Sequence, residues 1–359
     1  MGVGVVMPRP SRMVTRSAGT PRAAKFVSVD TGWVLQKVDA VVLPGAKGLS
    51  CEVSRRKSES TGPATLRQAK KKRPEAELGG PLGQRLPERA PKTLTEPTPS
   101  NGRPDVVADL AQYEAVHNPD GDVTYGIVAN GNPCAEAILG ELSGGPATYT
   151  GITDTHPYSV AWSPSGWYVA DAGMNAVLKV DRTGHVSTVA VLPPQPVTLT
   201  QPMVGALAAE FGAPADAFDC LVGVTYAFEP VPTDVEVDQN GALYVSILPG
   251  GPESPALGAR GKVFKVNAST GARTTVASGL LGEANVAVAS DGTLYATELF
   301  GGKVTKFANG KRSTAVTVDR PLAVEVHGGY LYVGQFADIS FGPTGPEVNA
   351  PGSVIRFKR

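Results

Sequence analysis

Five polar residues recur at matching places in a repeated strand pattern and could together bind a ligand or a cation. They are Asp234, Glu236, Asn285, Glu325 and His327, and Glu298 lies just past a later strand. Carboxylate and amide oxygens suit a hard divalent cation such as calcium. If the strands line one axis, these side chains are expected to converge on an axial channel. The alternative is a water-filled axis lined by acids without metal, because alternation sends only every other side chain to one side.

Nucleophilic catalysis by a Ser–His–acid arrangement is not expected. The chain has four histidines, and no serine lies in a G-x-S-x-G turn. Of the histidines, His185 falls in a turn and His117 in a polar linker. We assign no catalytic residue from the sequence. Whether the chain is an enzyme stays open, and the residues favour a non-catalytic protein.

The three cysteines leave two alternatives open. Cys134 and Cys220 both lie in segments that interrupt the repeat, while Cys51 lies far upstream. Cys134 and Cys220 can pair in an oxidising compartment, or both can remain free thiols. The spacing contains no C-x-x-C or Cys/His pattern that would indicate zinc.

The strands that must position these side chains come from a repeat. The clearest unit is PYSVAWSPSGWYVADAGMNAVLKVDRTGHVSTVA, residues 157–190. It is typical of four short strands at 159–162, 167–170, 177–181 and 186–190, separated by Gly-containing turns. One unit therefore predicts one four-stranded antiparallel sheet.

The same pattern returns three times, at 232–277, 283–318 and 321–357. A tyrosine marks each unit, with offsets of 76, 51 and 37 residues between Tyr168, Tyr244, Tyr295 and Tyr332. These offsets lie near a blade period of about 40 to 50 residues once insertions are removed. A single sheet cannot bury both faces, so the units are expected to stack around an axis. The chain is predicted to be all-β, a β-propeller of four-stranded antiparallel blades with the tyrosines in the blade core.

Two segments, 131–155 and 192–230, break the repeat, and the second contains a short helical pattern at 204–211. Long insertions can carry ligand specificity, or they can cover an exposed blade edge. The last unit also ends after its third strand. Because residues 106–110 resemble the fourth strand at 187–192, we predict that they supply the missing strand.

The first 104 residues differ in composition from the rest. They carry 19 Lys and Arg against 8 Asp and Glu, whereas residues 105–359 carry 14 against 25. Basic runs at 55–57 and 70–73 precede a Pro-rich stretch, and few large apolar residues are present. The sequence predicts a disordered basic segment, 1–104, before a propeller domain, 105–359.

The basic runs lack interleaved aromatic residues, so no specific nucleic-acid partner is expected. No apolar run approaches 18 residues, so no membrane interaction is expected. The start lacks the apolar core of a secretory signal. As written, the chain is expected to be cytoplasmic.

Four phrases carry a resemblance to a known family. They are VVADLAQYEAVHNPDGD (106–122), VADAG (169–173), VPTDVEVDQNGALYVS (231–246) and SDGTLYAT (290–297). Together they resemble the ScyD/ScyE family of NHL-like propellers over residues 105–359. The resemblance implies a six-bladed pattern and an extracellular location. Family members begin with a signal peptide and further blades, so the basic segment in that place suggests an incomplete ring or a mis-assigned start.

The sequence therefore favours a non-catalytic propeller that binds an unknown protein or small-molecule ligand on its loop face or in the axial channel. Such a protein needs no cofactor and is expected to be a monomer if the ring is complete. One alternative is a metal-dependent enzyme similar to lactonase or strictosidine-synthase propellers, with calcium at the axis. The other is a truncated product without independent function.

Overall fold

The computed structural model describes residues 26–29, 38–41, 50–52, 93–97, 104–252, 254–342 and 345–359. Side chains are described from Val106 onward, apart from residues 253 and 341–344. Within these residues, no helix is long and apolar enough to cross a membrane.

The described part of the N-terminal segment consists of short strands. Strand β1 (Phe26–Val29) pairs with β2 (Val38–Val41), and β3 (Ser50–Glu52), β4 (Thr93–Pro97) and β5 (Pro104–Asp109) form a second antiparallel sheet. The prediction that residues 1–104 are disordered falls mainly on residues outside the described ranges and stays a prediction.

The first complete blade follows the predicted unit closely. Its strands are β8 (Pro157–Ser163), β9 (Gly166–Asp171), β10 (Ala176–Asp181) and β11 (Val186–Val191). They pair antiparallel in the order β8-β9-β10-β11. Gly166 sits in the tight β8–β9 turn with φ of 128°, a conformation that favours glycine.

Three further blades repeat this plan. The second contains β14 (Pro232–Val237), β15 (Leu243–Ile247), β16 (Gly261–Val266) and β17 (Arg273–Leu280). The third contains β18 (Glu283–Val288), β19 (Leu294–Glu298), β20 (Lys303–Ala308) and β21 (Lys311–Thr317). The last contains β22 (Pro321–His327), β23 (Tyr330–Gln335) and β26 (Ser353–Lys358), and its insertion forms the hairpin β24 (Asp338–Gly342) and β25 (Gly345–Ala350).

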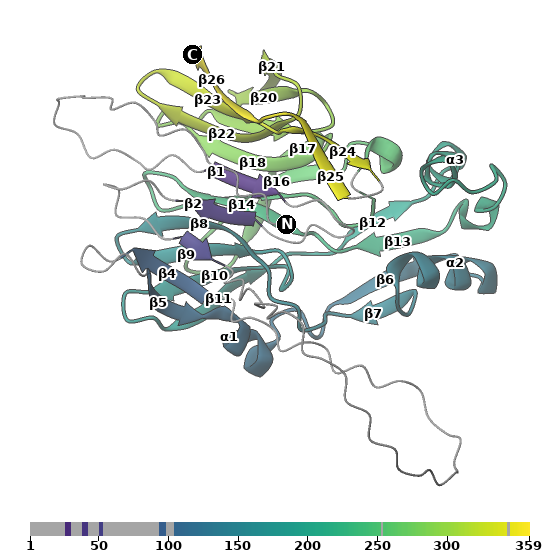
Figure 1. Ribbon diagram of the computed structural model, residues 1–359. Helices are drawn as coiled ribbons and strands as arrows, with labels where there is room; N and C mark the ends of the chain where they lie inside the picture. The colour runs from purple at the N-terminus through teal and green to yellow at the C-terminus, as the bar shows by residue number, and fades with distance from the viewer. Residues whose placement is uncertain are drawn as a thin grey trace, which may run out of the picture.

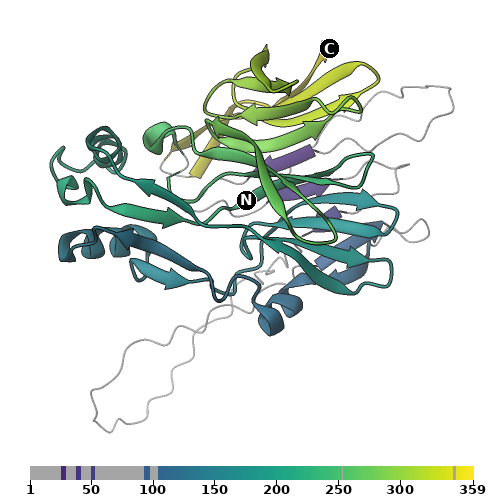
Figure 2. The same ribbon diagram turned by 180° about the vertical axis from the view of Figure 1, so that it is seen from behind.

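Successive blades contact one another through their first strands. Strand β8 contacts β14, β14 contacts β18, and β18 contacts β22. The N-terminal strands lie between the two ends of this series, because β1 contacts β22 while β2 and β3 contact β8. Figures 1 and 2 show the sheets succeeding one another from the lower, blue blade to the upper, yellow one. The fold is a β-propeller.

The seams between blades hold the hydrophobic core. Tyr168 packs with Val235 and Phe264 of the second blade, Tyr244 packs with Val286 of the third, and Tyr295 with Val333 of the last. The predicted core role of these three tyrosines is confirmed. Tyr332 is only half-buried and belongs to none of these clusters.

The prediction that residues 106–110 close the last blade is wrong. Within the described ranges, β26 pairs with β23 alone, and β5 pairs with β4 instead. Asp109 ends β5 and caps helix α1 (Leu110–His117) by accepting a hydrogen bond from the N–H of Gln112 at 3.0 Å. Leu110 then packs under the first blade against Trp167. Segment 106–110 is thus held at the opposite end of the blade series.

The two insertions join into one further unit. Strands β6 (Thr124–Ala129) and β7 (Thr148–Thr150) flank helix α2 (Pro133–Ser143), and strands β12 (Gln195–Thr198) and β13 (Thr225–Phe228) flank helix α3 (Gln201–Glu210) and the short helix η1 (Asp219–Leu221). Their sheet order is β12-β13-β6-β7. We call residues 124–150 and 195–228 the arm. The arm extends away from the blades in both views (Figures 1 and 2).

Candidate binding surface

A chain of hydrogen bonds links the first strands of the blades. Ser159 on β8 donates to one carboxylate oxygen of Asp234 on β14. The Nδ2 atom of Asn285 on β18 donates to the other oxygen of Asp234 at 2.7 Å. The Oδ1 atom of Asn285 accepts from the N–H of Val324 on β22 at 2.7 Å. The chain therefore connects four successive blades.

A recurrent irregularity helps to place these side chains. The pairing register shifts near the start of each first strand, between Pro157 and Ser159, Pro232 and Asp234, Glu283 and Val286, and Pro321 and Ala323. Such bulges redirect side chains locally. In the first three of these strands the third residue, Ser159, Asp234 or Asn285, forms a hydrogen bond with a neighbouring blade. In β22 the partner is instead the backbone N–H of Val324.

Of the five residues predicted to line an axial site, these contacts bring together Asp234 and Asn285. Both are almost fully buried, at 0% and 4% exposure. Glu236 and Glu325 are half-buried opposite Tyr244 and Tyr332, and His327 is exposed at the end of β22. Among the described residues, no group of three or more His, Cys, Asp or Glu side chains is placed to hold a metal ion.

Sequence reasoning missed Glu283, the first residue of β18. Its carboxylate is fully buried, and neither oxygen has a hydrogen-bond partner within the described part of the chain. Burial raises its pKa well above the ordinary value, and the charges of Asp234 and Glu298 raise it further. The sequence does contain a signal for Glu283. The first strands of the other three blades begin with proline, and only β18 begins with a charged residue.

Neighbouring Glu298 is stabilised differently. Its carboxylate accepts hydrogen bonds from Thr305, from the N–H of Leu281 at 3.0 Å and from Arg312 at 2.9 Å. Burial opposes ionisation of Glu298, but these donors outweigh it and lower its pKa. Glu298 is therefore a charged structural group of the third blade.

Another buried carboxylate, that of Asp120, fixes the base of the arm. Asp120 accepts hydrogen bonds from the hydroxyl of Tyr125 at 3.0 Å and from Nδ2 of Asn175 at 2.9 Å. Asn175, in the first blade, also accepts from the N–H of Val231 at 3.1 Å. Burial raises the pKa of Asp120 to about 6. These contacts tie the start of β6 and the end of the second insertion to the first blade.

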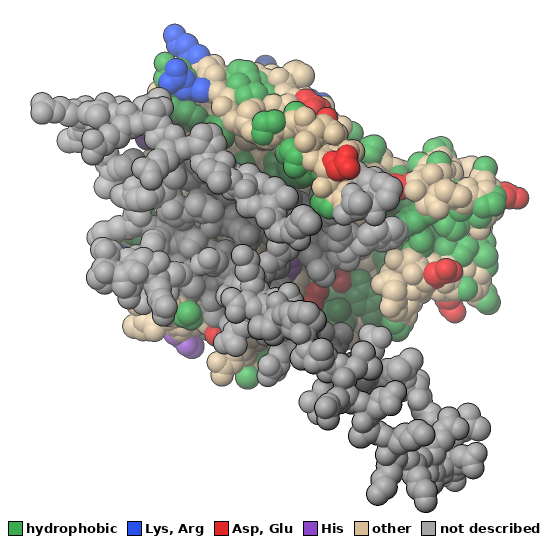
Figure 3. Space-filling model, viewed as in Figure 1, with side chains coloured by type: hydrophobic (Ala, Val, Ile, Leu, Met, Phe, Trp, Pro, Cys, Tyr) green, Lys and Arg blue, Asp and Glu red, His purple; other side chains and the backbone are tan. Residues whose placement is uncertain are grey.

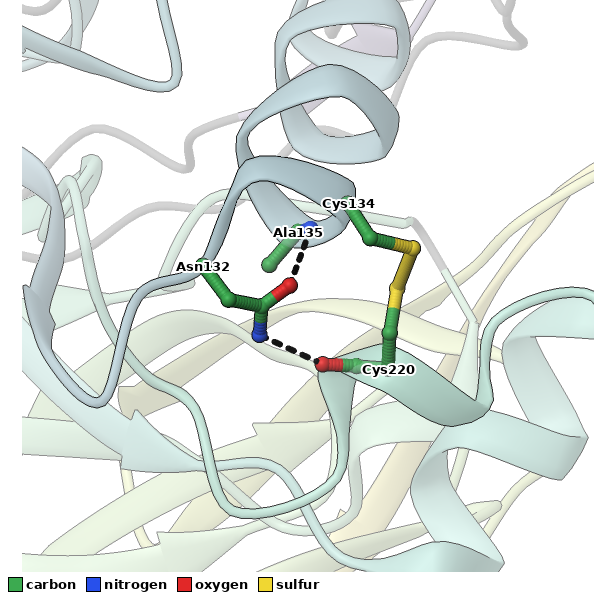
Figure 4. Close-up of a disulfide and its surroundings, with 4 residues drawn as sticks. All are labelled: Asn132, Cys134, Ala135 and Cys220. Atoms are coloured by element: carbon green, nitrogen blue, oxygen red, sulfur yellow. Dashed lines mark hydrogen bonds between the residues drawn. A yellow bond between two sulfur atoms is a disulfide. The ribbon is translucent and has the colours of Figure 1, made fainter.

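Within the arm, strands far apart in sequence pair and a disulfide joins the two insertions. Ile127 of β6 lies opposite Tyr226 of β13, and Cys134 is bonded to Cys220, with 6.2 Å between their Cα atoms. Asn132 caps α2 through the N–H of Ala135 at 2.9 Å and donates to the carbonyl of Cys220 at 3.0 Å (Figure 4). Both ends of the disulfide are therefore held in place.

The arm has a core of its own. Leu139 of α2, Leu207 of α3 and Leu221 of η1 pack together with Leu257, which belongs to helix η2 (Pro255–Leu257) of the second blade. The predicted helical segment at 204–211 is confirmed as part of α3. This packing makes the arm a continuous extension of the second blade.

The arm surface combines apolar and acidic side chains. Val128, Val222 and Phe211 are 52%, 41% and 37% exposed. The arm contains no Lys, Arg or His. All its acids are exposed: Glu136, Glu141, Glu210, Asp216 and Asp219. At the right of Figure 3, green and red side chains appear on the arm without blue ones.

Comparisons with known proteins assign no family to this chain. No family model matches the chain, and no curated protein matches it. A luciferin-regenerating enzyme is similar in structure at 12% identity and a TM-score of 0.36, over 59% of this chain and 66% of that one. An auxiliary nutrient-binding protein from Bacteroides thetaiotaomicron has 9% sequence identity and a TM-score of 0.34. The match covers 55% of this chain and 41% of that one.

A catalytically inactive virginiamycin B lyase from Staphylococcus aureus gives 12% identity and a TM-score of 0.29, over 57% of this chain and 71% of that one. The chain thus spans less than two thirds of the length of the first two structures. At these identities and TM-scores, the similarity supports no conclusion about activity or partners.

Proposed function

We propose that this protein is a non-catalytic propeller that binds a partner through the arm, with the blades as a rigid support. The observation that carries the proposal is the union of two distant insertions into one sheet, held by a disulfide and presenting exposed apolar side chains. Exposed apolar side chains gathered on a projecting unit are typical of interaction sites. A surface ordered before binding loses less entropy when the partner docks.

The blades offer less for recognition at the predicted axial positions. Asp234 and Asn285 use their polar atoms to connect blades, and both are buried. A ligand would have to displace these hydrogen bonds, leaving buried polar groups without partners. The exposed arm needs no such rearrangement.

The disulfide supports an extracellular location. Disulfides persist in oxidising compartments, whereas cytosolic thiols are kept reduced. The resemblance of residues 105–359 to the ScyD/ScyE family implies the same location. We therefore propose that the protein acts outside the cell.

A peptide selection tests the role of the arm without assuming a ligand. The full chain is immobilised in its oxidised form and exposed to a phage-displayed library of random peptides. Enriched peptides are then measured against V128S/V222S, which makes two exposed arm positions polar. V354S is the matched control, because Val354 on β26 has the same 52% exposure as Val128.

We expect enriched peptides to lose most of their affinity for V128S/V222S and to keep it for V354S. Each lost apolar contact at an interface centre costs roughly 1 kcal/mol or more, so the double variant should bind at least about tenfold more weakly. Peptides that bind both variants equally, or a selection without enrichment, would contradict the proposal. Circular dichroism of both variants verifies that they are folded.

A further inference from the structure

We propose that the occupant of the arm is a cationic, amphipathic polypeptide segment in which Lys or Arg alternates with large apolar residues. This inference rests on the proposed function, since it names the chemistry of the partner at that same surface. The apolar positions supply burial, and the charges of the arm select the partner.

The exposed apolar side chains lie at the far end of the arm for identifiable reasons. The pairing of β6 with β13 is irregular at Val128, since Ala129 lies opposite Thr225 and Ile127 opposite Tyr226. Val128 therefore has no cross-strand partner and points outward, as bulge residues do. This part of β6 is joined to the segment after η1, because Nδ2 of Asn130 donates to the carbonyl of Gly223 at 3.0 Å.

That hydrogen bond brings two apolar positions to one end. Val222 immediately precedes Gly223 and follows η1. Phe211, after α3, contacts the ring of Phe218 at 6.4 Å between centroids, and Phe218 immediately precedes η1. Val128 and Val222 thus lie near one another, and Phe211 is linked to the segment before Val222 through Phe218.

The charge of the arm has one sign. Its five acids are all exposed, and no basic residue lies within residues 124–150 or 195–228. Glu141 lies in the last turn of α2, and Glu210 ends α3, with no basic residue in either last turn. A negative side chain there opposes the helix dipole and costs about 0.3–1 kcal/mol. The carboxylate of Glu210 accepts a hydrogen bond from the hydroxyl of Ser254, whereas helix stability does not account for Glu141. Recognition of a cationic partner is therefore the better explanation for Glu141.

Charge complementarity also excludes other occupants. A nucleic acid or an anionic lipid surface would be repelled, because both require clustered Lys or Arg. The arm of a second copy would place one acidic arm against another. A segment with only apolar residues would make no use of the negative charge of the arm, whereas complementary charge adds specificity and speeds association.

Matched synthetic peptides test the inference on the full oxidised chain. The probe is an 18-residue amphipathic peptide of Leu and Lys, compared with peptides in which every Lys is replaced by Gln or by Glu. Affinity is measured by fluorescence anisotropy at low and high salt. The protein variants are E136Q/E141Q on the arm and D122N/E347Q as a control that removes the same charge from exposed positions outside the arm.

We expect the Leu-Lys peptide to bind more tightly than the Leu-Gln and Leu-Glu peptides, and more weakly as salt rises. E136Q/E141Q should weaken its binding by about three- to tenfold, since each exposed ion pair contributes up to about 1 kcal/mol. D122N/E347Q should leave its binding nearly unchanged, and V128S/V222S should weaken it.

The experiments distinguish a failure of the cationic-partner proposal from a failure of the proposed binding function. If library peptides depend on the arm while the Leu-Lys peptide binds no better than the Leu-Gln peptide, the cationic partner is refuted and the binding function survives. If D122N/E347Q weakens binding as much as E136Q/E141Q, attraction is general rather than local to the arm. If neutralising the basic runs 55–57 and 70–73 tightens binding tenfold, the chain's own segment occupies the arm, which also overturns an external partner.

Discussion

Asn285 and Asp234 join two blades through their side chains, with Nδ2 of Asn285 2.7 Å from Oδ2 of Asp234. The same oxygen of Asp234 accepts from the N–H of Val286 at 3.1 Å. Asn285 thus donates toward one blade and accepts from the next, since its Oδ1 receives the N–H of Val324. Two residues with the appearance of metal ligands serve as connectors between blades.

Replacing Asn285 with alanine should lower the free energy of unfolding by about 2–4 kcal/mol. The substitution removes the acceptor of a buried N–H and one donor to a buried carboxylate, and each loss costs roughly 1–3 kcal/mol. Urea unfolding measures the change. Asn240→Ala, at an exposed turn, is the control and should change stability little. A loss no larger than that of the control would show that the connection contributes nothing.

Glu283→Gln should stabilise the protein at neutral pH and leave it unchanged near pH 4. Because the folded-state pKa of Glu283 is raised, the native chain retains a proton that the unfolded chain releases. Stability is therefore lost as pH rises above the unfolded pKa of about 4.3 toward the folded value.

The measurement is the unfolding free energy of both proteins from pH 4 to pH 8. The difference between Glu283→Gln and the wild type should grow with pH. Glu347→Gln, at an exposed position, is the control. If Glu283→Gln destabilises the chain at pH 8, the buried carboxylate has a favourable role that its contacts do not reveal.

Counting reactive thiols before and after reduction tests the Cys134–Cys220 disulfide. Unfolded but unreduced protein should react with a thiol reagent at Cys51 alone, and reduction should expose all three cysteines. C134S/C220S should lower the unfolding free energy by about 2–4 kcal/mol, because the bond closes a long loop that includes the first blade. Three reactive thiols before reduction would contradict the pairing.

The blades could be predicted from the sequence because each is built from local hairpins. Turn residues such as Gly166 and the alternation around Tyr168 specify strands that pair with their immediate neighbours. The arm could not be predicted in this way. Its central pairing joins Ile127 to Tyr226 across a complete intervening blade, and no local pattern encodes that contact.

The wrong prediction for residues 106–110 has a chemical origin. Residues 106–110 have the alternation of a strand, but Asp109 also has the chemistry of a helix cap, and that second property directs the chain into α1. For Asp234 and Asn285, residue type alone does not distinguish a ligand from a buried connector. That distinction depends on which atoms of the next blade lie within hydrogen-bond reach.

Hydrogen–deuterium exchange of the full oxidised chain, with and without a peptide enriched in the library selection, tests the central claim most directly. We predict slower exchange on binding in α2, in α3 and in the segment from η1 to β13, with the blade strands unchanged. Protection confined to the blade strands or to the turns between them, with the arm exchanging as before, would contradict the account.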